Sequence, residues 1–363
     1  MKVVLTQEKL SKALSVVIRV VSSRTTLPIL NNILIRADDG QLTLSATNLE
    51  MAITEKIPAK IEKNGVITVP AKLLTEFVTN LPKVNITLEE VDGKLSISAG
   101  NYRSTINTMS AEDYPEIPEM VAKNQLVIPA DVFKKAVANT TLVASSDVTR
   151  PILTGVYIYN LDGNLYFVAT DGYRLAEKKV MPCSDEVAAI IPATTLNDVV
   201  RILGEDVSEV KIGFSDDQVS FEIDGILITS RLIDGNFINY RQLIPTKTDV
   251  TATLNRSEFV RVTKISELFA RESAGSVIMK ADSAVSMLNI HSVASQIGEN
   301  TAEAEATISG DGTVTLNSKY LLDGLNQLDG ENVKLRFSGK LAPILLTAED
   351  NDDYKHIIMP VKS

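Results

Sequence analysis

The chain has 363 residues, of which 44% are hydrophobic and 23% are charged, and its formal net charge at pH 7 is −10. These proportions are typical of a soluble globular protein of two or three domains, and they exclude a disordered chain. The acidic balance excludes a protein that coats nucleic acid with its whole surface, although it allows a local basic face.

The N-terminal ten residues turn polar by Thr6 and contain no apolar stretch of the length that a secretory signal needs. No run of the sequence approaches the roughly 18 apolar residues of a membrane span. Cys183 is the only cysteine, so no disulfide can form within the chain. We therefore expect a cytoplasmic protein that does not bind a membrane.

The sequence repeats itself, and the first clear repeat begins at residues 28–35. The pattern Pro-Ile-Leu-Asn-Asn-Ile-Leu-Ile of these residues returns 123 residues later, at 151–158, as Pro-Ile-Leu-Thr-Gly-Val-Tyr-Ile. The same offset relates 40–42 to 163–165 and 46–48 to 169–171. Collinear matches at one offset indicate duplicated domains rather than chance similarity.

Three further elements each occur three times along the chain. A strand–helix unit begins at 4–10, 127–133 and 253–259; a second lies at 69–74, 191–196 and 316–321; a strand lies at 84–88, 210–214 and 333–337. We infer three copies of one domain, with boundaries at 1–122, 123–248 and 249–363. Turn-rich joints at 115–118 and 245–248 separate them.

Within a copy, residues 41–45 and 94–98 alternate between apolar and polar, as half-buried strands do. The Asp-Gly pairs at 39–40, 92–93 and 162–163 predict tight hairpin turns between such strands. Each copy is therefore predicted to be an α+β domain of two helices packed on antiparallel sheet.

The first predicted helix of each copy has an apolar face and a basic one. The positions predicted to form the buried face are Leu10, Ala13, Leu14, Val17 and Val21 in copy one, Phe133, Ala136, Val137 and Thr140 in copy two, and Phe259, Val262, Ser266 and Phe269 in copy three. The basic residues away from them are Lys9, Lys12, Arg19, Lys134, Lys135, Arg261 and Lys264. Lys12, Lys135 and Arg261 occupy one repeat position.

Two interpretations of these basic residues remain open. They can be ordinary solvated helix faces, or they can face the phosphates of a nucleic acid. The predicted helices carry more Lys and Arg than Asp and Glu, whereas the whole chain has 36 basic and 46 acidic residues. This contrast favours a nucleic-acid face. Acidic residues at one position of the second helices, Glu76, Asp198 and Asp323, indicate that the attraction is weak.

Residues that could carry catalysis are few. The two histidines, His291 and His356, lie 65 residues apart, and no nucleotide-binding or zinc motif is present. The acidic run at 349–353 lacks the glycine and the distal glutamate of a calcium loop, so it predicts an acidic hairpin tip. We expect no enzyme, no metal and no cofactor; a hydrolase that uses Asp171 is the alternative.

Four stretches resemble the β subunit of bacterial DNA polymerase III, the replicative sliding clamp, and the resemblance covers the entire chain. They are Arg-Thr-Thr-Leu-Pro-Ile-Leu at 24–30, Thr-Arg-Pro-Ile-Leu-Thr-Gly at 149–155, Ala-Thr-Asp-Gly-Tyr-Arg-Leu-Ala at 169–176 and Met-Pro at 359–360. The resemblance implies a homodimeric, closed ring of six domains around double-stranded DNA, with helices inside and sheets outside. It also implies that Arg24 approaches the DNA.

The resemblance further implies two contact regions. A peptide-binding pocket between copies two and three would contain Leu153, Thr170, Gly172, Tyr173, Arg174, Leu175, Met359, Pro360 and Val361, with the arginine at its rim. A dimer contact would join Ile106 to Leu268 and Phe269. The implied partners are the polymerase α subunit, clamp-loader subunits and other proteins with short clamp-binding peptides.

Without the resemblance, residues 170–172 predict only a turn, and Met359 predicts only a core position. Two departures from the family pattern also leave the peptide preference open: Tyr173 stands where some relatives have histidine, and the chain ends in Val-Lys-Ser rather than Met-Arg-Leu. The competing function is a repeat scaffold that binds peptides without encircling DNA.

Overall fold

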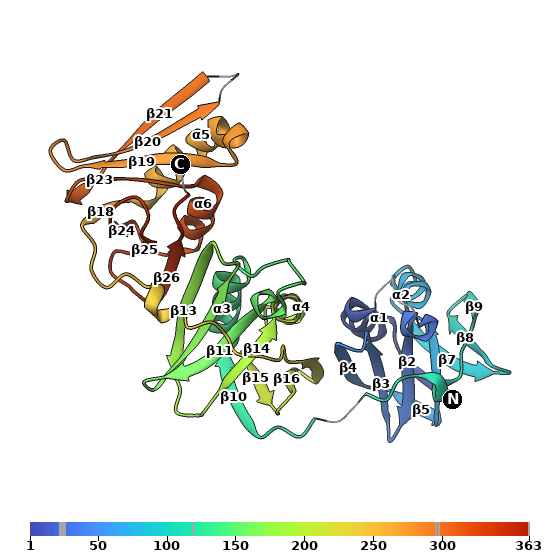
Figure 1. The fold of residues 1–363 in the computed structure, drawn as a ribbon. Coiled ribbons are helices and arrows are strands. Elements are labelled where there is room, and N and C mark those ends of the chain that lie inside the picture. The colour runs from blue at the N-terminus through green and yellow to red at the C-terminus, as the bar shows by residue number, and fades with distance from the viewer. Residues whose placement is uncertain (22–26, 118–119, 295, 297, 362–363) are drawn as a thin grey trace. The chain divides into compact units, whose positions relative to one another are not determined.

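The computed structural model describes residues 1–21, 27–117, 120–294, 296 and 298–361. In this part of the chain the strands form four antiparallel sheets, and six α-helices pack on them (Figure 1). The helices are α1 (Gln7–Val17), α2 (Ala71–Thr79), α3 (Ala130–Thr141), α4 (Ala193–Ile202), α5 (Arg256–Ala270) and α6 (Ser318–Gln327). They lie where the repeats predicted them, two in each copy.

The four sheets have the following strand orders. The first is β5 (Lys60–Lys63), β1 (Lys2–Thr6), β7 (Asn85–Val91), β8 (Lys94–Ala99) and β9 (Tyr102–Asn107). The second is β10 (Asn124–Pro129), β15 (Glu209–Phe214), β16 (Gln218–Ile223), β17 (Ile226–Arg231), β4 (Met51–Pro58), β3 (Gln41–Thr47), β2 (Asn32–Asp38) and β6 (Gly65–Pro70).

The third is β14 (Ala188–Pro192), β11 (Gly155–Leu161), β12 (Asn164–Thr170), β13 (Arg174–Pro182), β26 (Tyr354–Ile358), β25 (Ile344–Ala348), β24 (Asn332–Phe337), β18 (Val250–Asn255) and β22 (Thr307–Ser309). The fourth is β21 (Gly298–Glu305), β20 (Met287–Ala294), β19 (Ser276–Asp282) and β23 (Gly312–Asn317).

The first helix of each copy begins and packs as its sequence predicted. Thr6 caps α1 by accepting a hydrogen bond from the Lys9 amide, and Asn255 caps α5 by accepting one from the Glu258 amide. The anchor residues Leu10, Phe133 and Phe259 are completely buried. Two residues differ from the prediction. Helix α1 ends at Val17, so Val21 is half-buried beyond a short 3₁₀ turn, and Phe269 near the end of α5 is only half-buried.

The predicted Asp-Gly hairpins are confirmed. Asp39 and Gly40 join β2 to β3 with φ of 44° and 74°, and the pairs at 92–93 and 162–163 have similarly positive φ values. Two successive residues with positive φ match the twist of antiparallel strands, and Asp-Gly adopts this conformation at low cost. A fourth such pair, at 224–225, joins β16 to β17.

The compact units of the structure do not coincide with the repeats. One unit comprises Met1–Asp131 with Thr195–Leu232, and the other comprises Val132–Thr194 with Ile233–Ser363. Each unit contains one junction between copies: β17 of copy two pairs with β4 of copy one, and β26 of copy three pairs with β13 of copy two. Copy two is thus divided between the two units.

A buried carboxylate fixes the junction of the second unit. Glu177 of β13 is almost fully buried, and Lys355 of β26 donates a hydrogen bond to it over 2.8 Å. The hydroxyl of Tyr240, on the segment that links copies two and three, donates to the same carboxylate, and burial raises the pKa of Tyr240. Because a buried charge is costly unless it is paired, these contacts fix both strand register and linker position.

Helix α6 approaches β26 closely because Gly324 has no side chain. The ring of His356 on β26 is completely buried beneath this glycine, and burial lowers the pKa of His356 to about 3. The hydroxyl of Tyr354 lies 2.9 Å from Nδ1 of His356. A Cβ atom at position 324 would lie 2.6 Å from Cδ2 of His356, which is too close for any side chain. A glycine inside a helix costs about 1 kcal/mol relative to alanine, so packing explains its presence.

We therefore predict that Gly324→Ala destabilises the protein by about 1–3 kcal/mol, because overpacking outweighs the gain in helix propensity. The measurement is the urea midpoint of unfolding. Gly204→Ala is the matched control, since a Cβ atom there meets no atom within 4 Å. An unchanged or higher midpoint for Gly324→Ala would show that the helix can shift away from His356 freely.

Candidate functional sites

The turn from β12 to β13 is held by side-chain caps on its own backbone. The carboxylate of Asp171 accepts hydrogen bonds from the amides of Tyr173 and Arg174, at 2.9 and 3.0 Å. The hydroxyl of Thr170 accepts a bond from the Gly172 amide and donates one to the Arg174 carbonyl. Gly172 has a φ of 93°, which favours glycine. The turn therefore directs Tyr173 into solvent, where it is 61% exposed.

Arg174 does not lie at a rim, as the resemblance had implied; it is buried, with 9% exposure. Its guanidinium donates to Asp171 over 3.0 Å, to the Leu142 carbonyl over 3.0 Å, and to Asp323 of α6. It also lies 4.4 Å above the ring centroid of Tyr320. Burial of the guanidinium requires such neutralisation, so Arg174 ties copy two to copy three beneath the site.

Asp171 and Asp323 acquire structural roles from these contacts. Asp171 is engaged by two backbone amides and by Arg174, which leaves its carboxylate paired with a cation rather than available as a general base. The recurrence of an acid at the repeat position of Asp323 was visible in the sequence. Its partner was not, because Arg174 and Asp323 are 149 residues apart.

The C-terminal segment lies beside this turn. The Met359 amide donates to the Tyr173 carbonyl over 2.8 Å, and the Val361 amide donates to the Thr315 carbonyl over 2.9 Å. Met359 and Pro360 are half-buried, and Val361 is exposed. The structure therefore brings the predicted residues of the turn and of the tail together.

Leu175 and Leu153 differ in their surroundings. Leu175 is buried and belongs to an apolar cluster with Tyr159, Val168, Tyr240, Leu345 and Ile357. Leu153 is half-buried in the short helix η4 (Pro151–Thr154), and its carbonyl accepts a hydrogen bond from the Ser145 amide. Leu175 thus forms part of a packed wall, whereas Leu153 presents part of its side chain to solvent.

The basic residues of the first helices differ in exposure. Lys9, Lys12 and Arg19 in copy one and Arg261 and Lys264 in copy three are exposed, whereas Lys134 and Lys135 in copy two are half-buried. Lys135 pairs with Asp329 over 2.8 Å, and Arg261 pairs with Glu258. Lys12 lies near Glu55. Burial raises the pKa of Glu55, and the positive charge of Lys12 partly offsets this rise. Arg24 lies outside the described residues.

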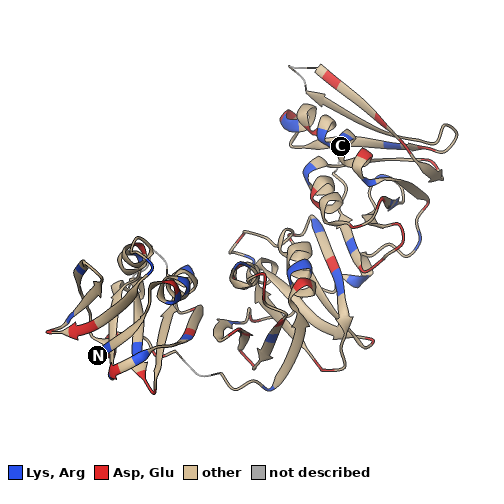
Figure 2. Cartoon of the chain, turned by 180° about the vertical axis from the view of Figure 1, so that it is seen from behind, with Lys and Arg blue, Asp and Glu red and all other residues tan. Residues whose placement is uncertain are grey.

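Within their bounds the six helices hold ten Lys and Arg and seven Asp and Glu. The whole chain holds 36 and 46, so its acidic excess lies outside the helices. Figure 2 shows, however, that Lys and Arg also lie on strands, so the separation of charge by element is incomplete.

The residues predicted for a dimer contact are not equally accessible. Leu268, near the end of α5, is 53% exposed, and Phe269 beside it is half-buried. Ile106 on β9 is only 4% exposed, because its side chain packs inside copy one. Ile106 therefore offers little surface to a partner.

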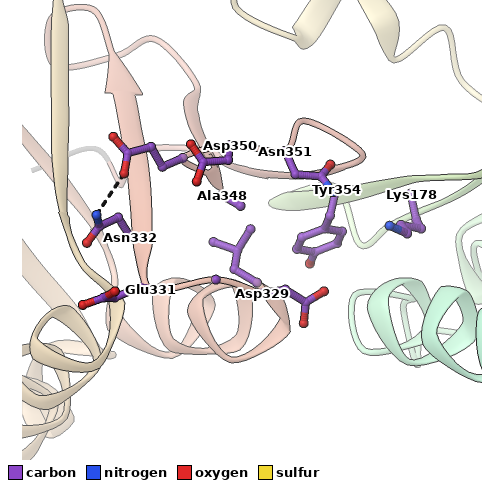
Figure 3. Close-up of a pocket in the computed structure, with 11 residues that line it drawn as sticks. Lys178, Asp329, Glu331, Asn332, Ala348, Asp350, Asn351 and Tyr354 are labelled. Carbon is purple, nitrogen blue, oxygen red and sulfur yellow. Dashed lines mark hydrogen bonds between the residues drawn. The ribbon is translucent and has the colours of Figure 1, made fainter.

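A cavity of about 120 Å³ lies beside the acidic loop at 349–353, which joins β25 to β26 as the predicted hairpin tip. In Figure 3 Glu331 and Asn332 lie at one end and Tyr354 and Lys178 at the other, and Asn332 donates to Glu349 over 2.9 Å. Burial lowers the pKa of Lys178, while Asp353 and Asp329 raise it. Among the described residues, no group of His, Cys, Asp and Glu is arranged to hold a metal ion.

The described part of the chain contains no helix with the length and apolar character that crossing a membrane requires.

Three family models match consecutive parts of the chain. The N-terminal domain of the DNA polymerase III beta subunit matches residues 1–118, the central domain matches 127–239, and the C-terminal domain matches 241–362. Among curated relatives, the beta sliding clamp of Synechocystis sp. is 31% identical over 388 residues and that of Bacillus subtilis is 29% identical over 377 residues. Both alignments cover 100% of this chain, and they cover 99% and 100% of the relatives.

Solved structures agree with this assignment. The crystal structure of the Bacillus subtilis DNA polymerase sliding clamp has a TM-score of 0.96 and 29% identity, covering 100% of this chain and 99% of that one. A DnaN sliding clamp from Pseudomonas aeruginosa bound to griselimycin has a TM-score of 0.94 and 27% identity, with full coverage of both chains. The three α+β copies are therefore three tandem clamp domains. The chain belongs to the family of DNA polymerase III beta subunits and is a DNA sliding clamp, in a family of processivity factors rather than catalytic subunits.

Proposed function

We propose that two copies of this chain join head to tail into a closed ring of six clamp domains around duplex DNA. The observation that carries the proposal is the identical construction of the two junctions within the chain. At each one, a strand of one copy pairs antiparallel with a strand of the preceding copy, and the two pairs occupy the same repeat positions: β17 with β4, and β26 with β13.

The strand of copy one that is equivalent to β17 and β26 is β9, and the strand of copy three that is equivalent to β4 and β13 is β21. Within the described residues, β9 and β21 each pair with a neighbour on one side only. An unpaired edge strand is a template for pairing with another chain. Because the two open edges belong to opposite ends, a second chain can complete both only in a head-to-tail arrangement, which closes when the rotation per contact divides the circle.

Charge supports the pairing of β9 with β21 of the partner. Arg103 is exposed on β9, whereas Glu299, Glu303 and Glu305 are exposed on β21. Opposite charges that face each other across antiparallel strands contribute roughly 0.2–1 kcal/mol per pair. Like charges on the two edges would have opposed the contact.

Helix packing at the second junction indicates which helices would meet in the dimer. There α3 meets α6: the side chain of Asn139 donates to the Gln327 side chain over 3.1 Å. By repeat position, α5 would meet the partner's α2. Leu268 on α5 and Leu73 on α2 are 53% and 52% exposed, and Leu73 holds the repeat position of Tyr320, which contacts Arg174 across the second junction. We therefore assign the apolar contact to Leu268 and Leu73 rather than to Ile106.

We predict that Leu268→Asp weakens the dimer at least tenfold, because it places an unpaired charge in an apolar contact. Sedimentation of the unaltered chain should give twice the chain mass of 39.5 kDa, and the variant should dissociate at higher concentration. Val285→Asp, at an exposed valine of copy three, is the control and should leave the mass unchanged. A monomeric unaltered chain at micromolar concentration would contradict the ring.

In the proposed ring the basic faces of the first helices line the hole. Lys9, Lys12, Arg19, Lys134, Lys135, Arg261, Lys264 and Arg24 would then attract phosphates without reading sequence. Lys135 and Arg261 are already paired with carboxylates, which moderates their attraction. A weak attraction suits a ring that has to move along DNA, and closure rather than affinity would retain it there.

We predict that the combined reversal of Lys12, Lys135 and Arg261 to Glu lowers retention on circular duplex DNA after loading by a clamp loader. The dependence of retention on log salt should become shallower by up to about three, since each lost phosphate contact removes about 0.9 from the slope. Lys63→Glu on β5 is the control for a charge change on a strand. Equal retention and slope for the triple variant would instead support a peptide scaffold that does not surround DNA.

We also propose that the residues around Tyr173 and Met359 bind short peptides of the polymerase α subunit, of clamp-loader subunits and of other clamp-binding proteins. The half-buried Met359 and Pro360, the exposed Val361 and the exposed Tyr173 form a mixed apolar surface over the rigid turn. Such surfaces suit peptides that carry an aliphatic or aromatic anchor. The relative from Pseudomonas aeruginosa that binds griselimycin supplies a probe for this site.

We predict that Met359→Ala weakens griselimycin binding by about tenfold, since truncation removes roughly 1–2 kcal/mol of apolar contact. Calorimetric titration measures this change. Leu341→Ala, at an exposed leucine of the same copy, should bind like the unaltered chain. Unchanged affinity of Met359→Ala would place the ligand elsewhere.

A further inference from the structure

The first junction, between copies one and two, contains a cavity of about 220 Å³. Its walls come from the end of β3 and the start of β4 in copy one, from residues 115–117 of the linker, and from β16 and β17 in copy two. All of these residues belong to the first compact unit. The cavity therefore lies within one compact unit.

Small side chains in the paired strands explain why the cavity exists. In the first junction Ala52 of β4 lies opposite Thr229 of β17. In the second junction the equivalent pair is Leu175 opposite Ile357, and both side chains are buried in the apolar cluster with Tyr240. Branched aliphatic side chains thus fill at the second junction the volume that alanine and threonine leave open at the first.

The cavity also lies at the first junction where the proposed peptide site lies at the second, because equivalent residues of the repeat line both. Thr47 and Met51 hold the positions of Thr170 and Arg174 and line the cavity. Leu49 holds the position of Gly172 and has a φ of 77°, a conformation that L side chains rarely adopt. Its side chain is 46% exposed and lines the cavity as well. The backbone of copy one is thereby held in a strained form that presents an aliphatic side chain to solvent.

We propose that this cavity is a second peptide-docking site, which takes a short segment of a partner protein with one branched aliphatic side chain beside a basic residue. The proposal rests on the proposed function, because it extends the peptide site by the repeat. Its volume is below the roughly 300–1,000 Å³ of sites for drug-sized ligands, so a single side chain fits it better than a cofactor. Gln218 and Thr229 supply polar groups for the backbone of the segment.

The net charge of the residues that line the cavity favours a peptide with a basic residue. Glu50, Glu116 and Arg231 line the cavity and are exposed, which leaves one net negative charge. At the second junction the uncharged Tyr173 and Met359 hold the positions of Glu50 and Arg231, and the charged residues there, Asp171, Asp323 and Arg174, are engaged with one another beneath the turn. The two sites therefore differ in the peptides that they favour, and this difference would allow two partners to bind one chain.

The test uses the full chain with labelled isoleucine and methionine methyl groups and the synthetic peptide acetyl-Ser-Lys-Leu-Lys-Ser-amide. We expect saturable shifts of the Ile117 and Met51 methyl signals, and at least tenfold weaker binding of the peptide with both Lys replaced by Glu. Ala52→Leu, which fills the cavity with the side chain found at the second junction, should weaken binding of the basic peptide at least tenfold. Thr229→Ile is an independent variant of the same kind.

Griselimycin titrated into the same samples separates this inference from the proposed function. Ala52→Leu and Thr229→Ile should leave griselimycin binding unchanged, whereas Met359→Ala should weaken it without affecting the shifts of Ile117. Absence of saturable shifts, equal binding of the acidic peptide, or full binding by either cavity variant would overturn the second site. Failure of the unaltered chain to bind griselimycin would instead overturn the peptide site proposed around Tyr173 and Met359.

Discussion

Antiparallel strand pairing between neighbouring copies is the interaction on which the rest of the structure depends. A copy on its own would leave unpaired the backbone N–H and C=O groups of the two strand edges that pair with neighbouring copies, and such edges are both costly and prone to aggregation. The chain satisfies four of these edges internally, through the pairing of β17 with β4 and of β26 with β13. The proposed ring applies the same requirement to β9 and β21, so its head-to-tail symmetry follows from strand pairing, and the apolar contact of Leu268 with Leu73 would accompany that pairing.

The buried polar groups of the second junction give this pairing its register. A slip by one residue would carry Glu177 to the opposite face of its sheet and away from Lys355 and Tyr240. Arg174 would similarly lose Asp323. Buried ion pairs add little net stability, but breaking one is expensive, and this asymmetry penalises every alternative register. The strand register beneath the turn that carries Tyr173 is therefore well determined.

Much of the architecture was predictable from the sequence, because a domain written three times repeats its local signals. The anchors Leu10, Phe133 and Phe259 marked the first helices, and the Asp-Gly pairs marked hairpins. These are short-range patterns. The contacts of Arg174 and the role of Glu177 were not predictable, since each depends on segments from different copies that meet only in the folded chain. The difference between Ala52 and Leu175 could be read from the aligned copies, but its meaning required knowing what lies opposite each residue.

The division of copy two between the compact units bears on how the chain would respond to being cut. The linker at 115–117 lies within the first unit, so a nick there leaves β4 and β17 hydrogen-bonded to each other, and the pieces stay associated. A fragment trimmed to the sequence repeat would instead bare a strand that normally lies in the middle of an eight- or nine-stranded sheet. The sequence repeat is thus the unit that was duplicated, whereas each compact unit of the structure contains segments of two repeats.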